Sequence, residues 1–246
     1  MDRLIYVAMS GAKNSELRQA TIANNLANVT TPGFRAELAA ARAVPALGGP
    51  GLGTRAYVLQ QTPGADMSPG VFQQTGRDLD VAVKGQGWLT IQTPTGEAYT
   101  RNGSFQIDSA GLLKTGAGEI VQGENGPLTI PENNRASIGI DGTVTAIDVQ
   151  NPTQSVEVGK LKLVNPANDQ LEKGLDGLFR LRSGEPAQTD PAVQLASGGI
   201  EGSNVNSVEQ LVNMISTQRH FDLQVKLLQT AEQNSRSASS IMSLNG

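Results

Sequence analysis

The hydrophobic period of this chain changes twice, and this change restricts the possible folds more than any other feature. Apolar residues recur at spacings of three and four near both ends of the 246-residue chain. Between about residues 75 and 197 they alternate with polar residues instead. The first spacing is typical of amphipathic helices and the second of half-buried strands. The sequence therefore predicts a helix at each end and a β-rich body between them.

The N-terminal helix is expected over residues 1 to about 30. A seam of alternating three- and four-residue spacings runs from Met1 to Val29, and Ser15 and Gln19 interrupt its apolar character. Polar residues, Asn25 among them, occupy the opposite face. An ordinary amphipathic helix packed on its own domain gives this pattern, and so does a helix that requires a partner helix.

The C-terminal helix is expected from Ser207, which can cap it, with Gln210 three residues later to complete a capping box. Because both terminal helices carry similar seams, the simplest arrangement pairs them as a coiled-coil-like domain. A lone helix pair exposes much apolar surface, so we expect an assembly in which helices of several subunits pack together. The candidate subunit-interface residues are Ile5, Ala8, Ala12, Ile22, Leu26, Val29, Leu211, Met214, Ile215, Phe221, Val225 and Leu228.

A turn is expected where the N-terminal helix ends. Asn28 tolerates the left-handed conformation that often ends helices. Thr31 precedes Pro32 and is therefore pushed out of the helical region. Pro32 and Gly33 suit the two central positions of a type II turn, with positive φ at Gly33. These residues predict the junction between the helix and the rest of the chain.

The segment that follows, residues 36–74, is expected to be an extended connector. Residues 36–44 are rich in alanine and could add two turns of helix. Residues 47–53 are dense in glycine, which predicts a loop, and residues 55–62 have the pattern of a strand.

The body, residues 75–199, is predicted to be an antiparallel β domain. Its short strands are separated by turn signals, of which Asp141-Gly142 is a strong hairpin signal. Trp88 and Phe105 lie in adjoining strands and are expected to form an aromatic pair in the core. The candidate strands are 79–83, 88–93, 98–107, 112–115, 119–121, 128–130, 136–140, 143–149, 156–164, 178–181 and 193–195.

The composition argues against most chemistry. The net charge of −4 gives no electrostatic footprint for nucleic acid, and no apolar run is long enough to insert in a membrane. The chain has no cysteine and one histidine, so no pattern indicates a metal or a cofactor. Asp78 and Asp80 could act as paired carboxylates, but exposure at a strand edge is the expectation. The N-terminus lacks the pattern of a cleaved signal peptide.

Three separated groups of residues resemble the motifs of bacterial flagellar rod and hook proteins. The first is the start Met1-Asp2-Arg3-Leu4-Ile5-Tyr6 with residues 23–34, the second comprises residues 79–88 and 99–105, and the third is residues 201–209 with 214–219. Residues 2–6 and 226–231 are most similar to the proximal-rod type. The distal-rod subunit is the near relative, and the much longer hook protein is excluded by length.

The resemblance implies a structural subunit, not an enzyme. Such subunits leave the cell through the flagellar type III export apparatus without cleavage and assemble helically into the periplasmic rod. Residues 1–35 and 200–246 would then form the assembly domain around the export channel, and residues 75–199 an outer domain. The implied partners are other copies of the chain and other rod subunits. The alternatives are a distal-rod subunit, or a periplasmic carbohydrate-binding or cell-wall hydrolase domain. The small number of aromatic residues argues against carbohydrate binding, and the missing catalytic constellation argues against a hydrolase.

Overall fold

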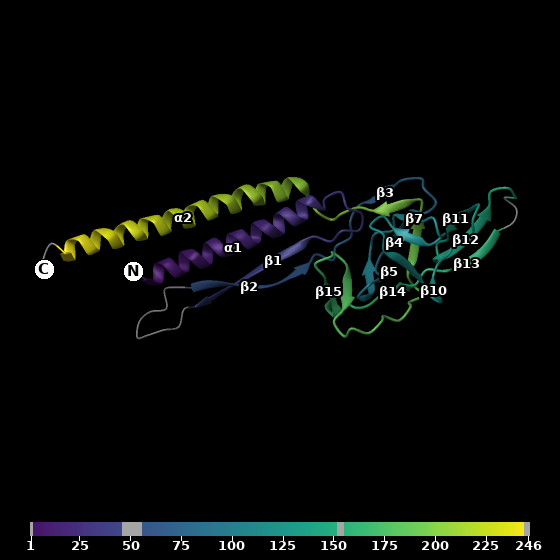
Figure 1. Cartoon of the computed structure of the whole chain (residues 1–246), viewed down its shortest axis with the longest axis horizontal. Coiled ribbons are helices and arrows are strands. Elements are labelled where there is room, and N and C mark those ends of the chain that lie inside the picture. Colours follow the sequence, from purple (N-terminus) through teal and green to yellow (C-terminus); the bar gives the residue numbers. More distant parts are fainter. Residues whose placement is uncertain (1, 46–55, 152–154, 244–246) are drawn as a thin grey trace. The chain divides into compact units, whose positions relative to one another are not determined.

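The computed structural model describes residues 2–45, 56–151 and 155–243 (Figure 1). It is mainly β with a helix near each end, which confirms the predicted terminal helices and the β-rich body between them. Contacts divide the chain into two compact units. The helical unit comprises Met1–Ala27, Glu37–Ala65 and Asn206–Gly246, and the β unit comprises Asn28–Ala36 and Asp66–Val205.

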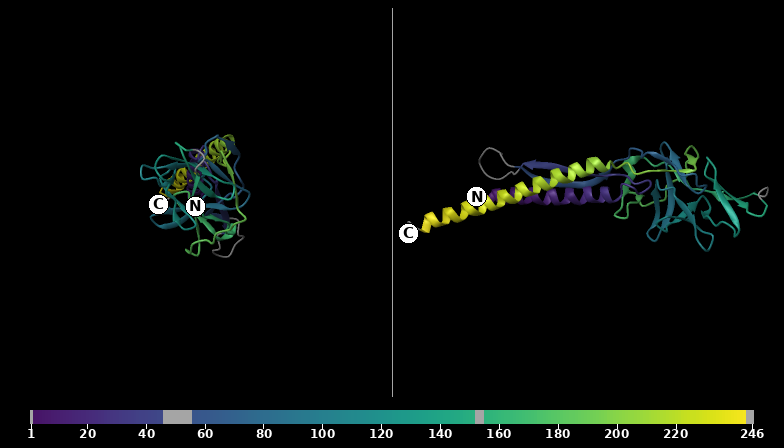
Figure 2. Two further views of the ribbon diagram at one scale, coloured as in Figure 1. Left: turned by 90° about the vertical axis from the view of Figure 1, so that its right-hand side faces the viewer. Right: turned by 90° about the horizontal axis from the view of Figure 1, so that it is seen from above.

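Two long helices dominate the helical unit. Helix α1 (Asp2–Ala27) and helix α2 (Ser207–Ser243) lie side by side and run in opposite directions, with both chain ends at the same end of the pair (Figures 1 and 2). Asn206 caps α2, since its side-chain oxygen accepts hydrogen bonds from the backbone N–H groups of Val208 and Glu209 at 3.1 and 3.3 Å. The predicted cap at Ser207 is therefore one residue late. Helix α1 ends at Ala27, a little before the expected residue 30.

A β ribbon completes the helical unit. Strands β1 (Glu37–Pro45) and β2 (Ala56–Ala65) pair antiparallel, and both contact α1. The expected helical turns at residues 36–44 are wrong, because pairing with β2 overrides the helical preference of the alanines. The expected strand at residues 55–62 is largely confirmed by β2, while residues 47–53 and Arg55 lie outside the described residues.

Every strand pair in the described part of the β unit is antiparallel, as predicted. The largest sheet has the order β15-β16-β6-β5-β9-β8-β7, with β10 beside β9 and β14 beside β5. Its strands are β5 (Trp88–Thr93), β6 (Gly96–Thr100), β7 (Phe105–Ile107), β8 (Leu113–Thr115), β9 (Ile120–Gly123), β10 (Gly126–Pro127), β14 (Leu163–Val164), β15 (Leu171–Lys173) and β16 (Phe179–Leu181). The short 3-10 helix η1 (Asn168–Gln170) precedes β15.

Three smaller sheets accompany it. One has the order β11-β12-β13, one joins β17 to β4, and one joins β18 to β3. Their strands are β3 (Phe72–Gln74), β4 (Val81–Lys84), β11 (Asn134–Ile138), β12 (Thr143–Asp148), β13 (Ser155–Lys160), β17 (Gln194–Ser197) and β18 (Gly199–Glu201). The hairpin signal Asp141-Gly142 is confirmed, since β11 pairs with β12 across it. Residues 98–107 form two strands instead of the single one predicted, and residues 128–130 contribute an isolated bridge at Thr129.

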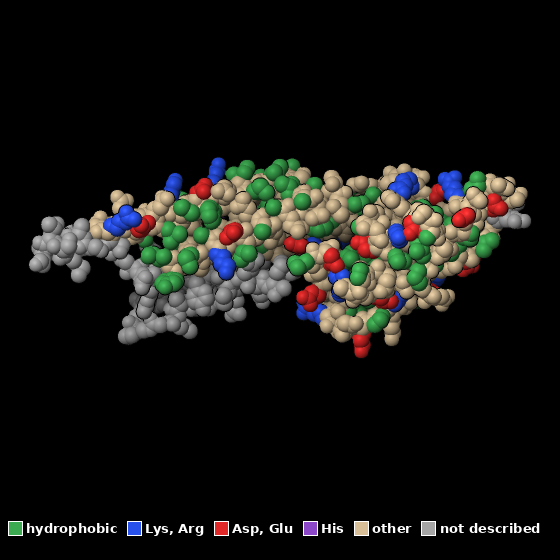
Figure 3. All heavy atoms as spheres, viewed as in Figure 1, with side chains coloured by type: hydrophobic (Ala, Val, Ile, Leu, Met, Phe, Trp, Pro, Cys, Tyr) green, Lys and Arg blue, Asp and Glu red, His purple; other side chains and the backbone are tan. Residues whose placement is uncertain are grey.

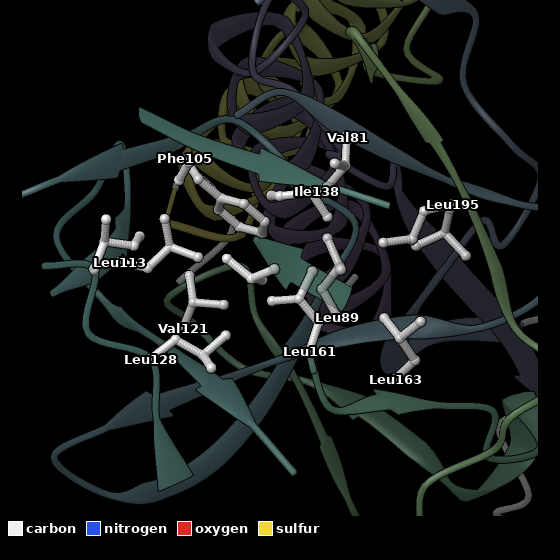
Figure 4. Close-up of a cluster of buried hydrophobic side chains, with 14 of the residues drawn as sticks. Val81, Leu89, Phe105, Leu113, Val121, Leu128, Ile138, Leu161, Leu163 and Leu195 are labelled. Atoms are coloured by element: carbon white, nitrogen blue, oxygen red, sulfur yellow. The ribbon is translucent and has the colours of Figure 1, made fainter. Parts of the chain in front are cut away.

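The core of the β unit is a cluster of aliphatic side chains around Phe105 (Figure 4). It draws Val81 from β4, Leu89 from β5, Ile138 from β11 and Leu195 from β17. Side chains from several small sheets therefore share one interior. Trp88 is not paired with Phe105 as predicted. The centre of its ring lies 4.6 Å from that of the Phe179 ring on β16, because both rings lie on the face of the largest sheet that is turned away from the core cluster.

Candidate functional site

The β unit is fastened at the point where the chain reaches it from α1 and leaves it for α2. Glu201, at the end of β18, is 4% exposed and lies between two buried guanidinium groups. Its carboxylate is 2.6 Å from Nη1 of Arg35 and 3.1 Å from Nη1 of Arg101. It also accepts a hydrogen bond of 2.8 Å from the backbone N–H of Gly70. We call Arg35, Arg101 and Glu201 the junction triad.

The triad holds three buried charges in a small volume. Burial lowers the pKa of the Arg101 guanidinium, and the charge of Glu201 opposes that shift. Arg101 also donates to the backbone carbonyls of Val83 and Gly85 at 3.3 and 2.7 Å. One carboxylate thus joins the segment after α1, the β6–β7 connection and β18, because buried charges require partners.

Asn204 makes a second connection between the same parts of the chain. Its side-chain oxygen accepts a hydrogen bond of 2.7 Å from the N–H of Ala36, and its amide donates to the carbonyls of Asp66 and Ser68, each at 3.0 Å. The backbone N–H of Gly33 donates to the carbonyl of Glu201 at 2.7 Å. Glu201 and Asn204 therefore connect the end of the β unit by hydrogen bonds to the segments around residues 33–36 and 66–68.

Two glycines permit this close approach. Gly33 has a φ of +68°, and a Cβ atom there would overlap the backbone of Arg101. A Cβ atom on Gly70 would overlap the carbonyl oxygen of Gly202. A larger residue at either position would force the junction segments apart, and at Gly33 it would also adopt a left-handed backbone.

The turn predicted at the junction lies in the β unit. The N–H of Phe34 donates to the carbonyl of Thr31 at 3.3 Å, which places Pro32 and Gly33 at the two central positions of a turn. Asn28 does not adopt the left-handed conformation expected of it. Instead, its backbone and side-chain oxygens accept hydrogen bonds from Thr31 at 3.2 and 3.1 Å, which close the end of the helix without that conformation.

Asn25 was expected on the polar face of α1, but it is buried. Its amide donates to the carbonyl of Glu37 at 2.9 Å, and its oxygen accepts from the N–H of Glu37 at 2.7 Å. The side chain thus pairs with the backbone at the start of β1 as a neighbouring strand would. Its position differs from the expectation because α1 is covered on two sides, by α2 and by the ribbon.

Helix α2 has apolar residues on two opposite faces. With about 3.6 residues per turn, Met214, Thr217, Phe221, Leu228 and Ala231 share one face, of which Thr217 and Ala231 are buried. The other face is exposed in the described part of the chain, and we call it the second face of α2 (Figure 3). Its apolar members are Val208, Leu211, Val212, Ile215, Leu223 and Leu227.

The candidate interface residues divide between these environments. Ala8 and Ile22 are buried in the helical unit, on the line of α1 that also holds Ser15. Leu211 and Ile215 are exposed. The remaining candidates are half-buried: Ile5, Ala12, Leu26, Val29, Met214, Phe221, Val225 and Leu228. Helix α1 also exposes Tyr6, Met9 and Leu17, which the seam did not include.

The candidate catalytic carboxylates are held by basic partners. Asp78 forms an ion pair with Arg135, and Asp80 forms one with Arg77 at 3.3 Å and accepts a hydrogen bond from Thr75 at 2.7 Å. Asp80 is buried, so the expected exposure is wrong for this residue. Among the described residues, no group of three or more His, Cys, Asp or Glu side chains could hold a metal ion. Neither α1 nor α2, as far as the structure describes them, combines the length and apolarity of a transmembrane helix.

Comparison with known proteins places these features in a family. The chain is 44% identical over 253 residues to flagellar basal-body rod protein FlgF of Escherichia coli, and this match covers 100% of both chains. The chain belongs to the flagellar basal-body rod protein family. FlgF of Salmonella typhimurium is 43% identical, again over 100% of both chains. FlgG of Bacillus subtilis is 34% identical over 260 residues, with 95% of this chain and 96% of the relative covered.

Three family models match separate parts of this rod protein. They are described as flagella basal body rod protein (residues 5–35), flagellar hook protein FlgE/F/G D1 domain (82–146) and flagellar basal body rod FlgEFG protein C-terminal (196–241). Each matched segment contributes one member of the junction triad: Arg35, Arg101 and Glu201 respectively.

Two members of the triad lie within the motifs described for the sequence, but no role was predicted for either of them. Arg101 lies in the segment 99–105 and Glu201 in the segment 201–209. Charged side chains are mostly exposed, so neither the composition nor the hydrophobic period of the sequence predicts that these two residues are buried. A signal was present in the surroundings, because glycine follows Glu201 directly and Gly103 lies two residues after Arg101.

Proposed function

We propose that this rod protein is a proximal-rod subunit that polymerises through α1 and α2. The observation that carries the proposal is the second face of α2, which is apolar and exposed although the opposite face already packs in the helical unit. Monomeric proteins seldom expose many large apolar side chains together on one face, and such groups mark interaction surfaces. The greater identity to the two FlgF relatives than to FlgG of Bacillus subtilis supports the proximal position.

The assembly contact joins unlike surfaces of neighbouring copies. The second face of α2 carries Arg219 and Lys226 among its apolar residues, whereas the exposed face of α1 presents Tyr6, Met9 and Glu16. Contact between two different surfaces is heterologous, and a heterologous contact that does not close generates an open helix of subunits. The α1–α2 pair is then a coiled-coil-like assembly domain. Of the residues expected in that domain, 1–35 and 200–246, the segments 28–35 and 200–205 belong instead to the β unit.

The proposed surroundings follow from this role. The partners are further copies and other subunits of the rod, proximal and distal, and the location is the periplasmic part of the basal body. The type III export apparatus delivers the chain without cleavage. The mass of the protein recovered from purified basal bodies tests the last point, because a cleaved leader would leave a shorter chain.

The assembly surface is tested with one charge. Val212→Asp places a carboxylate in the second face of α2, at a valine that is 61% exposed. Exposed substitutions of this kind usually change the stability of the fold by less than about 0.5 kcal/mol. We expect the variant to retain its circular dichroism but to fail to restore swimming in a strain that lacks the gene, since a charge buried at an interface has no partner.

Val149→Asp is the matched control. This valine is 67% exposed but belongs to the β unit. The control variant should swim. Normal motility of the Val212→Asp strain, with normal rods in its basal bodies, would contradict assembly through this face.

The proximal position is tested separately by electron microscopy of basal bodies from a strain that lacks the protein. We expect a rod whose proximal segment is itself incomplete and which carries no distal segment. A complete proximal rod without its distal part would instead identify a distal-rod subunit.

A further inference from the structure

A groove of about 550 Å³ opens on the β unit beside the junction triad. Arg35 and Arg101 line it together with Trp88, Gln86, Asn165 and Asn168. The guanidinium carbon of Arg101 lies 5.3 Å from the centre of the Trp88 ring. A volume of this size accommodates a side chain or a small molecule.

The charges at this groove do not balance within the triad. Two guanidinium groups, 1% and 6% exposed in Arg35 and Arg101, share the single carboxylate of Glu201. Asp66 is a further carboxylate close enough to sense Arg35, but hydrogen bonds from Ser68 are the main cause of its lowered pKa. The triad itself therefore has one excess positive charge.

Buried hydrogen-bond donors of the two arginines that line the groove are also unpaired. Within the described residues, Nε of Arg35 and Nε of Arg101 have no hydrogen-bond partner. Nη1 of Arg35 is close to Glu201, but its orientation does not make a hydrogen bond. Buried polar groups are nearly always paired, so unpaired donors of two buried arginines at one groove are unusual. A carboxylate matches both deficits, because it accepts charge-assisted hydrogen bonds from a guanidinium and carries one negative charge.

We propose that this groove binds a carboxylate side chain of a second copy of the chain. The single excess charge suits a monoanion better than a phosphate, which carries about two charges near neutral pH. The chain has 23 acidic and 19 basic residues, so a neighbouring copy is a ready source of carboxylates for a cationic groove. This inference rests on the proposed function, in which copies lie beside one another.

Trp88 provides a direct measurement, since it is the only tryptophan of the chain and lines the groove. Sodium acetate, titrated into the full-length protein, should change the Trp88 emission in a saturable way, with half-saturation on the order of millimolar for so small a ligand. Sodium chloride at the same ionic strength should not. No saturable change with acetate, or a larger one with inorganic phosphate, would overturn the carboxylate assignment.

Gln86→Glu tests the source of the carboxylate. Gln86 is exposed in the turn before β5, so the change places a negative charge beside the groove without disturbing the triad. We expect weaker acetate binding, by about tenfold, and weaker self-association in sedimentation. Gln106→Glu, on an exposed residue of β7 away from the groove, should alter neither.

The outcomes separate this inference from the proposed function. Weaker acetate binding with unchanged self-association would mean that the groove takes a free carboxylate, which overturns the proposed source. Rod assembly by the Val212→Asp variant would contradict the proposed function whatever Trp88 reports.

Discussion

Removal of the charge of Glu201 should destabilise the β unit severely. Glu201→Gln leaves Arg35 and Arg101 buried without their only anionic partner in the triad. Loss of one partner from a buried ion pair costs about 3–5 kcal/mol. The glutamine oxygen can still accept one neutral hydrogen bond, which restores roughly 1 kcal/mol. The net loss is therefore about 3 kcal/mol, and about 4–5 kcal/mol is expected for Glu201→Ala.

Guanidinium unfolding followed by Trp88 emission measures this loss, because Trp88 is 3% exposed in the same unit and becomes fully exposed only when that unit unfolds. With an m-value on the order of 4 kcal/mol/M, a loss of about 3 kcal/mol lowers the midpoint by about 0.7–0.8 M. Glu157→Gln, at an exposed residue of β13, controls for the charge change and should stay within about 0.5 kcal/mol of the parent protein.

A shift of less than about 0.2 M for Glu201→Gln would refute the reasoning, because it would mean that the triad gains little from its carboxylate. A second test uses Arg101→Met with and without Glu201→Leu. The double variant should lose less unfolding free energy than the two single variants lose in sum, since it removes both unlike charges together.

Three further predictions concern the β unit, and the same unfolding experiment measures each. Gly33→Ala should cost on the order of 3 kcal/mol, because the alanine must adopt a left-handed backbone and displace the backbone of Arg101; a midpoint equal to that of the parent would show that the junction tolerates a Cβ atom. Phe105→Ala should cost about 3–5 kcal/mol through the cavity it leaves in the core cluster, and a loss below about 1 kcal/mol would contradict the packing of that ring in the cluster. A hydrogen bond from Arg180 is the main cause that lowers the pKa of Asp176 below its ordinary 3.8. The ionised carboxylate therefore stabilises the folded unit above pH 3.8, and this contribution is lost as the pH falls through the lowered pKa. The stability difference between the parent and Asp176→Asn should shrink below about pH 4, and a difference that stays constant down to pH 2.5 would be inconsistent with the shift.

Much of this architecture could be predicted from hydrophobic period and turn chemistry. The two terminal helices follow from spacings of three and four, and the β11–β12 hairpin follows from Asp141-Gly142, because only local geometry decides these features. Strand β1 could not be predicted in this way. Its alanine-rich residues favour a helix locally, and their pairing with β2 is a tertiary effect.

The site was harder to predict because its chemistry joins distant parts of the chain. Arg35 and Glu201 are 166 positions apart, and nothing in the local pattern of either residue shows that they meet. The second face of α2 was predicted only in part, through the candidate interface residues Leu211 and Ile215. A single heptad seam accounts for one partner, whereas Val208, Val212 and Leu223 lie off that seam. Their common face is recognised only when the other face of the helix is known to be covered.

The fastening of the β unit at Glu201 has a consequence for how this protein can change during evolution. The segment that follows α1 and contains Arg35 and the segment that leads toward α2 and contains Asn204 are held together inside the unit itself. Loops elsewhere in the unit, such as the Asp141-Gly142 hairpin, can therefore lengthen or shorten while the distance between those two segments stays constant. The spacing of the two segments that follow α1 and precede α2 in the sequence then stays the same whatever the size of those loops. A graft that exchanges residues 36–200 of two related proteins would keep Arg35 and Glu201 from one parent and Arg101 from the other, so its success depends on whether the triad forms again.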